Sequence, residues 1–207
     1  LFAVGIFLAG LLIPFSKEII QLTLGPSYME GSLVLVVMLI YAAFRSLGIL
    51  NISMLLAGSK PKAHVTFSTI FMIVSIPTSY LVLAPIDAQL PGLQLGSLGL
   101  AIKTLVITIL QSSVVSWWIC RDYGWKFDWI YQIIVLSAAL SLGWLSFKLI
   151  EILKLLTPLN LVIEGGLVLF VYCGLLGIMV WFIPEVTGAS RQEVKNCLFK
   201  LIKLRFL

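Results

Sequence analysis

The sequence contains very little charge. Of its 207 residues, 11% are Asp, Glu, Lys or Arg and 60% are hydrophobic, and the mean hydropathy is +1.11. A water-soluble domain of this length needs more charge than this to cover its surface. The composition therefore excludes an ordinary soluble protein. It favours a chain that spends most of its length inside a bilayer.

Residues that carry catalytic chemistry are also scarce. The single histidine, His64, ends the polar segment GSKPKAH, and we expect it to be an exposed loop residue. The sequence has no G-x-S-x-G setting, no pair of Asp residues inside an apolar run, no H-E-x-x-H and no Cys/His cluster. Its three cysteines imply no disulfide framework. We therefore expect no enzyme, no catalytic residue, no metal and no cofactor.

The hydrophobic residues occur in runs of roughly 20, the length that a helix needs to cross a bilayer. The candidate spans are about 1–15, 31–57, 65–85, 96–120, 129–149 and 160–183. They are apolar on every face, whereas strands of a membrane barrel would alternate in polarity. The sequence predicts an all-α integral membrane protein with one six-helix lobe over 1–183. Because it begins at Leu1 and not at Met, we expect it to be a C-terminal fragment.

The positions of Lys and Arg predict the orientation of these spans. With the loops numbered alternately, nine basic residues lie on one side and three on the other, where the segment APIDAQLPGLQLGS has none. The positive-inside rule places the richer side in the cytoplasm, with both termini of the segment cytoplasmic. The basic tail over 184–207 is either an amphipathic helix on anionic lipid or a disordered segment. The net charge of +5 is therefore explained by the membrane, and no nucleic-acid partner is expected.

One charge interrupts the second span. Arg45 lies near the middle of the run from Gly31 to Gly58 and is the only charged residue in it. A guanidinium there costs about 2.5–3.5 kcal/mol in lipid, so it should face the bundle interior or a water-filled cavity. It either lines a cavity that binds an anion or pairs with a carboxylate. Within this sequence only Glu164 offers a carboxylate inside a span.

The third and fourth spans carry further polar residues. Lys103 lies about two turns into the fourth span, above a polar stripe of Thr104, Thr108 and Gln111. Lys103 either snorkels outward to the headgroups or joins Arg45 in a positively charged pocket. In the third span, Pro77 predicts a kink in the helix.

An ordered set of segments resembles a known family. The chain contains P-F-S-x-x-I-I-x-L-x-x-G-x-x-Y, then a long apolar span, then LLAGSKPK, and later G-S-x-G-x-A-I. Over residues 1–120 it is similar to the C-terminal half of polysaccharide flippases, the O-antigen and lipopolysaccharide exporters of the multidrug/oligosaccharidyl-lipid/polysaccharide superfamily. Residues 121–183 match by hydropathy alone. The resemblance implies the last six helices of a two-lobe transporter with 12 or 14 helices.

What the resemblance implies about function is the flipping of an oligosaccharide linked to polyprenyl pyrophosphate across the inner (cytoplasmic) membrane by alternating access. Arg45 and Lys103 would be the substrate-binding residues, and the partners would be membrane lipid and a missing N-terminal lobe or a second copy. Two alternatives stay open. One is a multidrug extruder of the same superfamily, which would need acidic residues in the membrane. The other is a membrane assembly or scaffold protein in which Arg45 pairs with a carboxylate of another subunit.

Overall fold

Helices joined by short turns make up the residues that the computed structural model describes, which are 2–85, 91–125, 129–156 and 161–182. The described part contains no strand, and the predicted all-α class is confirmed. The chain divides into two compact units, Leu1–Asp128 and Trp129–Leu207. The predicted tail over 184–207 lies outside the described residues.

Five helical segments of the described chain are long and apolar enough to cross a membrane. They are Phe2–Thr23, Pro26–Ala57, Pro61–Leu83, Gly96–Asp122 and Ile130–Leu149. The sixth predicted span coincides with α7 (Leu161–Phe182), which carries a shorter apolar stretch at Gly166–Val180. The molecule is thus a multi-pass helical membrane protein.

The first segment extends further than the sequence predicted. After α1 (Phe2–Leu12), a 3-10 turn at Ile13–Phe15 contains Pro14 and leads directly into α2 (Ser16–Thr23). A proline is compatible with the first turn of a helix, because the amide hydrogen that it lacks has no partner there. Pro14 therefore does not end the helical segment, although we expected the span to stop at about residue 15.

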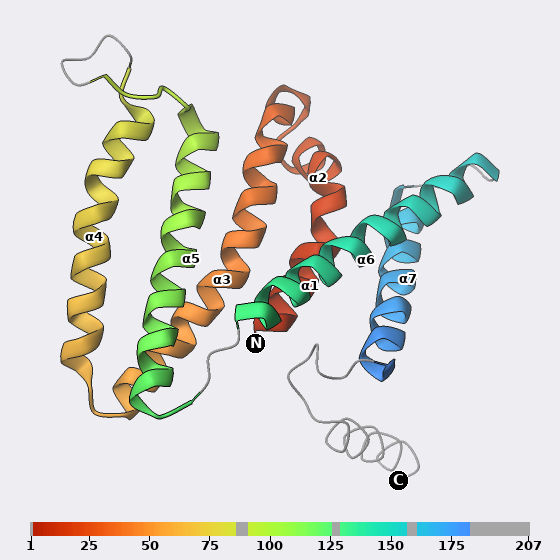
Figure 1. The fold of residues 1–207 in the computed structure, drawn as a ribbon. Coiled ribbons are helices and arrows are strands. Elements are labelled where there is room, and N and C mark those ends of the chain that lie inside the picture. Colours follow the sequence, from red (N-terminus) through yellow and green to blue (C-terminus); the bar gives the residue numbers. More distant parts are fainter. Residues whose placement is uncertain (1, 86–90, 126–128, 157–160, 183–207) are drawn as a thin grey trace. The chain divides into compact units, whose positions relative to one another are not determined.

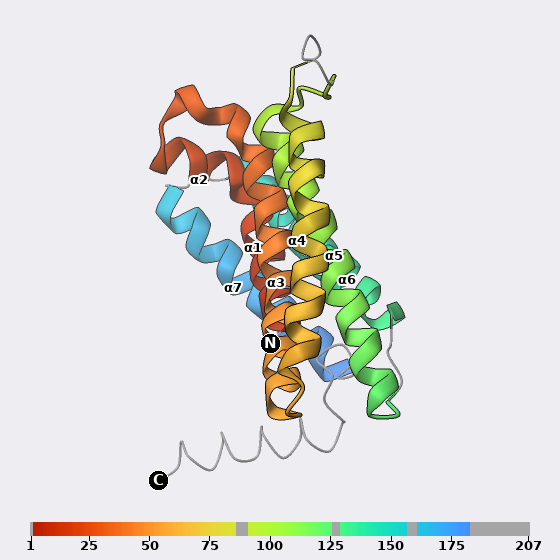
Figure 2. The same cartoon turned by 90° about the vertical axis from the view of Figure 1, so that its left-hand side faces the viewer.

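The helices of the first unit form a row. α3 (Ser32–Ala57) and α5 (Gly96–Asp122) make its central contact, α1 packs against α3, and α4 (Pro61–Leu83) packs against α5. The order along the row is α1, α3, α5 and α4 (Figure 1). In the view turned by 90°, these four helices overlap, while α2 and the 3-10 turn Pro26–Gly31 project to one side (Figure 2). α3 also contacts α4, so α3, α4 and α5 are in mutual contact.

A tight turn joins α3 to α4 at one end of the row, which we call the Lys60 end. Ser59 adopts a left-handed conformation with φ of 56°, and the Lys60 amide donates to the Leu55 carbonyl at 2.9 Å. Pro61 then starts α4. The Lys60 ammonium pairs with Asp122 and lies 5.5 Å from the ring centroid of Trp118. These contacts fix the ends of α3 and α4 against the end of α5.

In the described part of the second unit, α6 (Trp129–Leu156) packs against α7. On α6, the buried Ser146 hydroxyl donates to carbonyls of its own helix, to that of Leu142 at 2.7 Å and that of Gly143 at 3.0 Å. Lys148 pairs with Glu151 three residues further along α6. The hydroxyls of Ser137 and Ser141 likewise donate to carbonyls of α6, so these polar groups find partners within their own helix.

Candidate functional site

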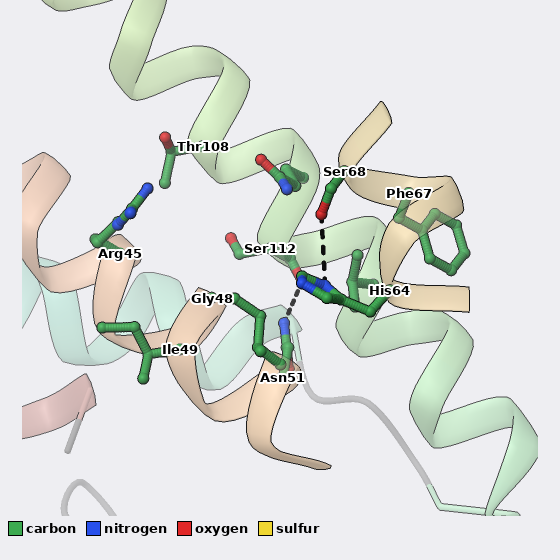
Figure 3. Close-up of a pocket in the computed structure, with 12 residues that line it drawn as sticks. Arg45, Gly48, Ile49, Asn51, His64, Phe67, Ser68, Thr108 and Ser112 are labelled. Atoms are coloured by element: carbon green, nitrogen blue, oxygen red, sulfur yellow. Dashed lines mark hydrogen bonds between the residues drawn. The ribbon is translucent and has the colours of Figure 1, made fainter. Parts of the chain in front are cut away.

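Arg45 lines a pocket where α3, α4 and α5 meet. The pocket has a volume of about 240 Å³. Polar and apolar side chains mix in its lining: Arg45, Gly48, Ile49, Asn51 and Ile52 from α3, His64, Phe67 and Ser68 from α4, and Thr108, Gln111, Ser112 and Val115 from α5. In Figure 3 the Arg45 side chain reaches from α3 toward Thr108 of α5.

The guanidinium has no carboxylate partner in the described part of the chain. The ion pairs found there are Lys60–Asp122 and Lys148–Glu151. Glu164, the partner that the sequence offered, lies outside the residues whose side chains the structure describes. Among the twelve residues that line the pocket, Arg45 carries the only permanent charge, and none is acidic. The pocket is consequently electropositive.

A buried hydrogen-bond network closes one side of the pocket between α3 and α5. The Asn51 amide nitrogen donates to the Ser112 carbonyl at 3.0 Å and contacts Ser116 Oγ at 2.9 Å. The Ser116 hydroxyl in turn lies 3.0 Å from Asn51 Oδ1. All three residues are buried. In a bilayer such bonds between helices give polar groups the partners that lipid cannot offer, so this network fixes the register of α3 on α5.

His64 lies in the first turn of α4 and lines the pocket, so the expectation of an exposed loop residue was wrong. It is half-buried, and its Nδ1 lies 3.4 Å from Ser68 Oγ, one turn further along α4. In Figure 3 the imidazole extends from α4 toward Gly48 and Asn51 of α3. The helix begins at Pro61, earlier than the predicted boundary at 65, and this brings His64 onto the helix and into the site.

Lys103 occupies a different place. Its ammonium donates to Ser75 Oγ at 2.5 Å and to Ser79 Oγ at 2.8 Å on α4, and it is not among the residues that line the Arg45 pocket. The two serines flank Pro77, through which α4 continues without interruption. Lys103 therefore links α5 to α4 beside this proline. The sequence had left two alternatives for Lys103, snorkelling to the headgroups or a pocket shared with Arg45, and this position corresponds to neither.

Four polar residues of the pocket escaped the sequence reasoning: Asn51, His64, Ser68 and Ser112. Asn51 carried a readable signal, because an amide six residues after Arg45 in an apolar run indicates contact with another helix and not with lipid. Ser112 carried less, because isolated serines are common in membrane helices and bond their own backbone. Thr108 and Gln111, by contrast, belong to the polar stripe that the sequence indicated, and both line the pocket.

Fold and site together define a multi-pass α-helical membrane protein with an electropositive, polar pocket between three of its helices. No protein-family model matches the chain, and neither a curated protein nor a solved structure matches it.

Proposed function

We propose that this chain is the C-terminal lobe of a polysaccharide flippase. In this proposal the Arg45 pocket binds the pyrophosphate of a lipid-linked oligosaccharide during its transfer across the membrane. A second lobe, either N-terminal to this chain or from a second copy, would complete the translocation cavity. The observation that carries the proposal is the guanidinium near the midpoint of α3, which faces a polar pocket that contains no carboxylate.

The chemistry of the pocket suits a phosphate group. A guanidinium donates parallel hydrogen bonds to two oxygens of one phosphate, and its charge resists deprotonation. The side-chain amide of Gln111 and the hydroxyls of Thr108 and Ser68 lie around the same space and can donate to further oxygens. A pocket lined in this way recognises an anion in a place where lipid tails offer no hydrogen bonds.

The size of the pocket favours the headgroup over the whole substrate. Pockets that enclose a drug-sized ligand measure about 300–1,000 Å³, whereas this one measures about 240 Å³. In the proposal the pyrophosphate therefore occupies the pocket, the prenyl chain stays in the bilayer, and the sugars extend beyond it. The pocket lies between the midpoint of α3 and the Lys60 end, so an inner-leaflet substrate would reach it if that end is cytoplasmic.

A multidrug extruder fits the site less well. Organic cations are bound in membranes by carboxylates, and none of the twelve residues around the pocket is acidic. The scaffold alternative predicts a different consequence for Arg45, namely that its loss would reduce assembly and abundance. The following experiment separates it from the flippase.

The experiment compares Arg45→Ala and Arg45→Lys with the unmodified full-length protein, purified in detergent. Farnesyl pyrophosphate serves as a soluble lipid pyrophosphate, and farnesol serves as the uncharged control. We expect Arg45→Ala to weaken binding by about 10- to 100-fold, because a charge-assisted contact contributes about 1.5–3 kcal/mol. Arg45→Lys should retain part of the affinity, since a cavity accepts a point charge that a bidentate ion pair does not. Lys17→Ala removes an exposed charge from α2 and should leave binding unchanged.

The same variants give a second reading in cells. Unchanged abundance of Arg45→Ala with loss of surface polysaccharide supports the flippase. Loss of the protein itself in Arg45→Ala supports the structural ion pair and hence the scaffold. Equal affinity of the unmodified protein for farnesyl pyrophosphate and farnesol would overturn the proposed pyrophosphate site.

A further inference from the structure

His64 gives the pocket a second group that can carry positive charge. Arg45 comes from the middle of α3 and His64 from the first turn of α4, 19 positions further along the chain, and the fold brings both into one pocket. They are the only residues with ionisable side chains among the twelve that line it. The polar stripe of α5 faces them with Thr108, Gln111 and Ser112, which are uncharged.

Ser68 holds the imidazole in this position. Its hydroxyl lies 3.4 Å from Nδ1, and because a hydroxyl both donates and accepts hydrogen bonds, the contact is compatible with the neutral ring and with the imidazolium. No hydrogen bond to Nε2 is found within the described part of the chain. The ring therefore has one nitrogen anchored to its own helix and the other free for a ligand.

We infer that His64 is the second anion-binding residue of the pocket, and that its imidazolium and the Arg45 guanidinium hold one phosphate or pyrophosphate group between them. This inference rests on the proposed function and names the contact that would make binding depend on pH. An imidazolium donates from both nitrogens and carries charge, whereas the neutral ring has a single N–H donor. An anion that reaches both side chains should thus bind together with a proton.

The surroundings of His64 favour a coupling between anion binding and protonation of its imidazole. On α3 the ionisable group that faces the pocket is Arg45, and neither α5 nor the rest of α4 contributes a charged side chain to it. The basic and acidic residues Lys60 and Asp122 pair with each other outside the pocket. Among the described residues that line the pocket, no carboxylate competes for the imidazolium. Two neighbouring cations repel each other, and a bound dianion offsets that repulsion.

The test measures binding at two pH values on the full-length protein in detergent. Farnesyl pyrophosphate and inorganic pyrophosphate are titrated at about pH 5.5 and about pH 8, on either side of the range in which an ordinary imidazole titrates. Pyrophosphate gains negative charge as pH rises, so the trend due to the ligand alone is read from His64→Gln. Relative to that variant, we expect the unmodified protein to bind about tenfold more tightly at the lower pH and equally at the higher pH.

The outcomes separate this inference from the proposed function. Identical pH profiles in the unmodified protein and in His64→Gln overturn the role of His64, while loss of binding in Arg45→Ala still supports the pyrophosphate site. Absence of binding to the unmodified protein at both pH values overturns both. If the coupling is seen, tighter binding of farnesyl pyrophosphate than of inorganic pyrophosphate assigns the site to a lipid headgroup, and equal binding assigns it to a free phosphate.

A second measurement needs no variant. His64 is the single histidine of these 207 residues, so segmental ¹⁵N labelling of this part of the protein gives one assignable set of imidazole signals in nuclear magnetic resonance. At about pH 6.5, addition of farnesyl pyrophosphate should move these signals toward those of the imidazolium, and farnesol should leave them unchanged. Unmoved signals at saturating farnesyl pyrophosphate would overturn the inference even if His64→Gln failed to fold.

Discussion

Asn51 and Arg45 are polar residues six positions apart on α3, and they differ in whether their side chains have partners on another helix. The Asn51 amide finds its partners on α5, in Ser112 and Ser116. The Arg45 guanidinium lines the adjacent pocket and has no acidic partner in the described part of the chain. A polar group that is fully paired stabilises the fold, whereas a cation without a partner is available to a ligand. We therefore expect Asn51 to contribute to stability and Arg45 to contribute to ligand binding.

Replacing Asn51 with alanine should therefore affect stability. Asn51→Ala removes the three hydrogen bonds that join Asn51 of α3 to Ser112 and Ser116 of α5. We expect the free energy of unfolding to fall by about 1–2 kcal/mol, as for other hydrogen bonds between membrane helices. Thermal unfolding in detergent measures the change. Ser53→Ala is the matched control, because the exposed Ser53 hydroxyl bonds only to the Ile49 carbonyl of its own helix; equal effects of the two variants would contradict the prediction.

At the scale of elements, α4 and α5 pack closely at a glycine. A Cβ atom added to Gly99 would overlap the Cβ of Leu95 and lie 2.9 Å from Cγ1 of Val82 on α4. Further along the same pair of helices, Lys103 binds the two serines that flank Pro77. Close packing and hydrogen bonds thus act together where hydrophobic burial between helices contributes little.

Gly99→Ala tests how much the close contact between α4 and α5 contributes to stability. Alanine favours a helix over glycine by about 0.8–1.0 kcal/mol, but overpacking at a close contact costs about 1–3 kcal/mol. We expect a net loss of stability, seen as a lower midpoint of thermal unfolding in detergent. Gly174→Ala on α7 serves as the control, because a Cβ there meets nothing within 4 Å. Its midpoint should stay the same or rise, and a comparable fall in both variants would exclude a specific contact at Gly99.

At the scale of the whole molecule, the two ends of the first unit differ in charge. The Lys60 end combines Lys60, Lys62, Arg121 and Asp122 with aromatic side chains, and Arg121 lies 5.6 Å from the ring centroid of Trp117. At the opposite end, residues 91–95 carry no charge, and the segment 13–31 contributes one basic residue, Lys17, together with Glu18 and Glu30. The positive-inside rule predicts from this difference that the Lys60 end faces the cytoplasm. The proposed route of the substrate, from the inner leaflet into the Arg45 pocket, depends on this orientation.

Cysteine labelling tests the orientation. In a variant without native cysteines, Lys62→Cys and Leu93→Cys place single thiols at exposed positions near the two ends. A charged maleimide, which cannot cross the bilayer, is added to intact cells. It should label Leu93→Cys directly and Lys62→Cys only after the membrane is permeabilised. The reverse pattern would invert the topology and place the entrance of the pocket on the outside.

The sequence by itself determined that this protein is an α-helical membrane protein and where its helices lie. The length and uniform apolarity of the runs carry that information locally, because each span must satisfy its own backbone in lipid. It also identified Arg45, since a charge in the middle of a span is costly wherever the helix packs. Boundaries set by proline were less secure, as the continuation through Pro14 and the early start of α4 at Pro61 illustrate.

Tertiary structure alone decided which polar residues meet. The consecutive helices α3 and α4 and the later helix α5 bring Arg45, His64 and Gln111 around one pocket, while Lys103 binds the serines beside Pro77. Helical periodicity assigns each residue to a face of its own helix, but the partner of that face depends on how the helices rotate and cross. Those angles are set by close contacts such as that of Gly99 with Val82 and by the Asn51 network, and neither can be read from one helix at a time.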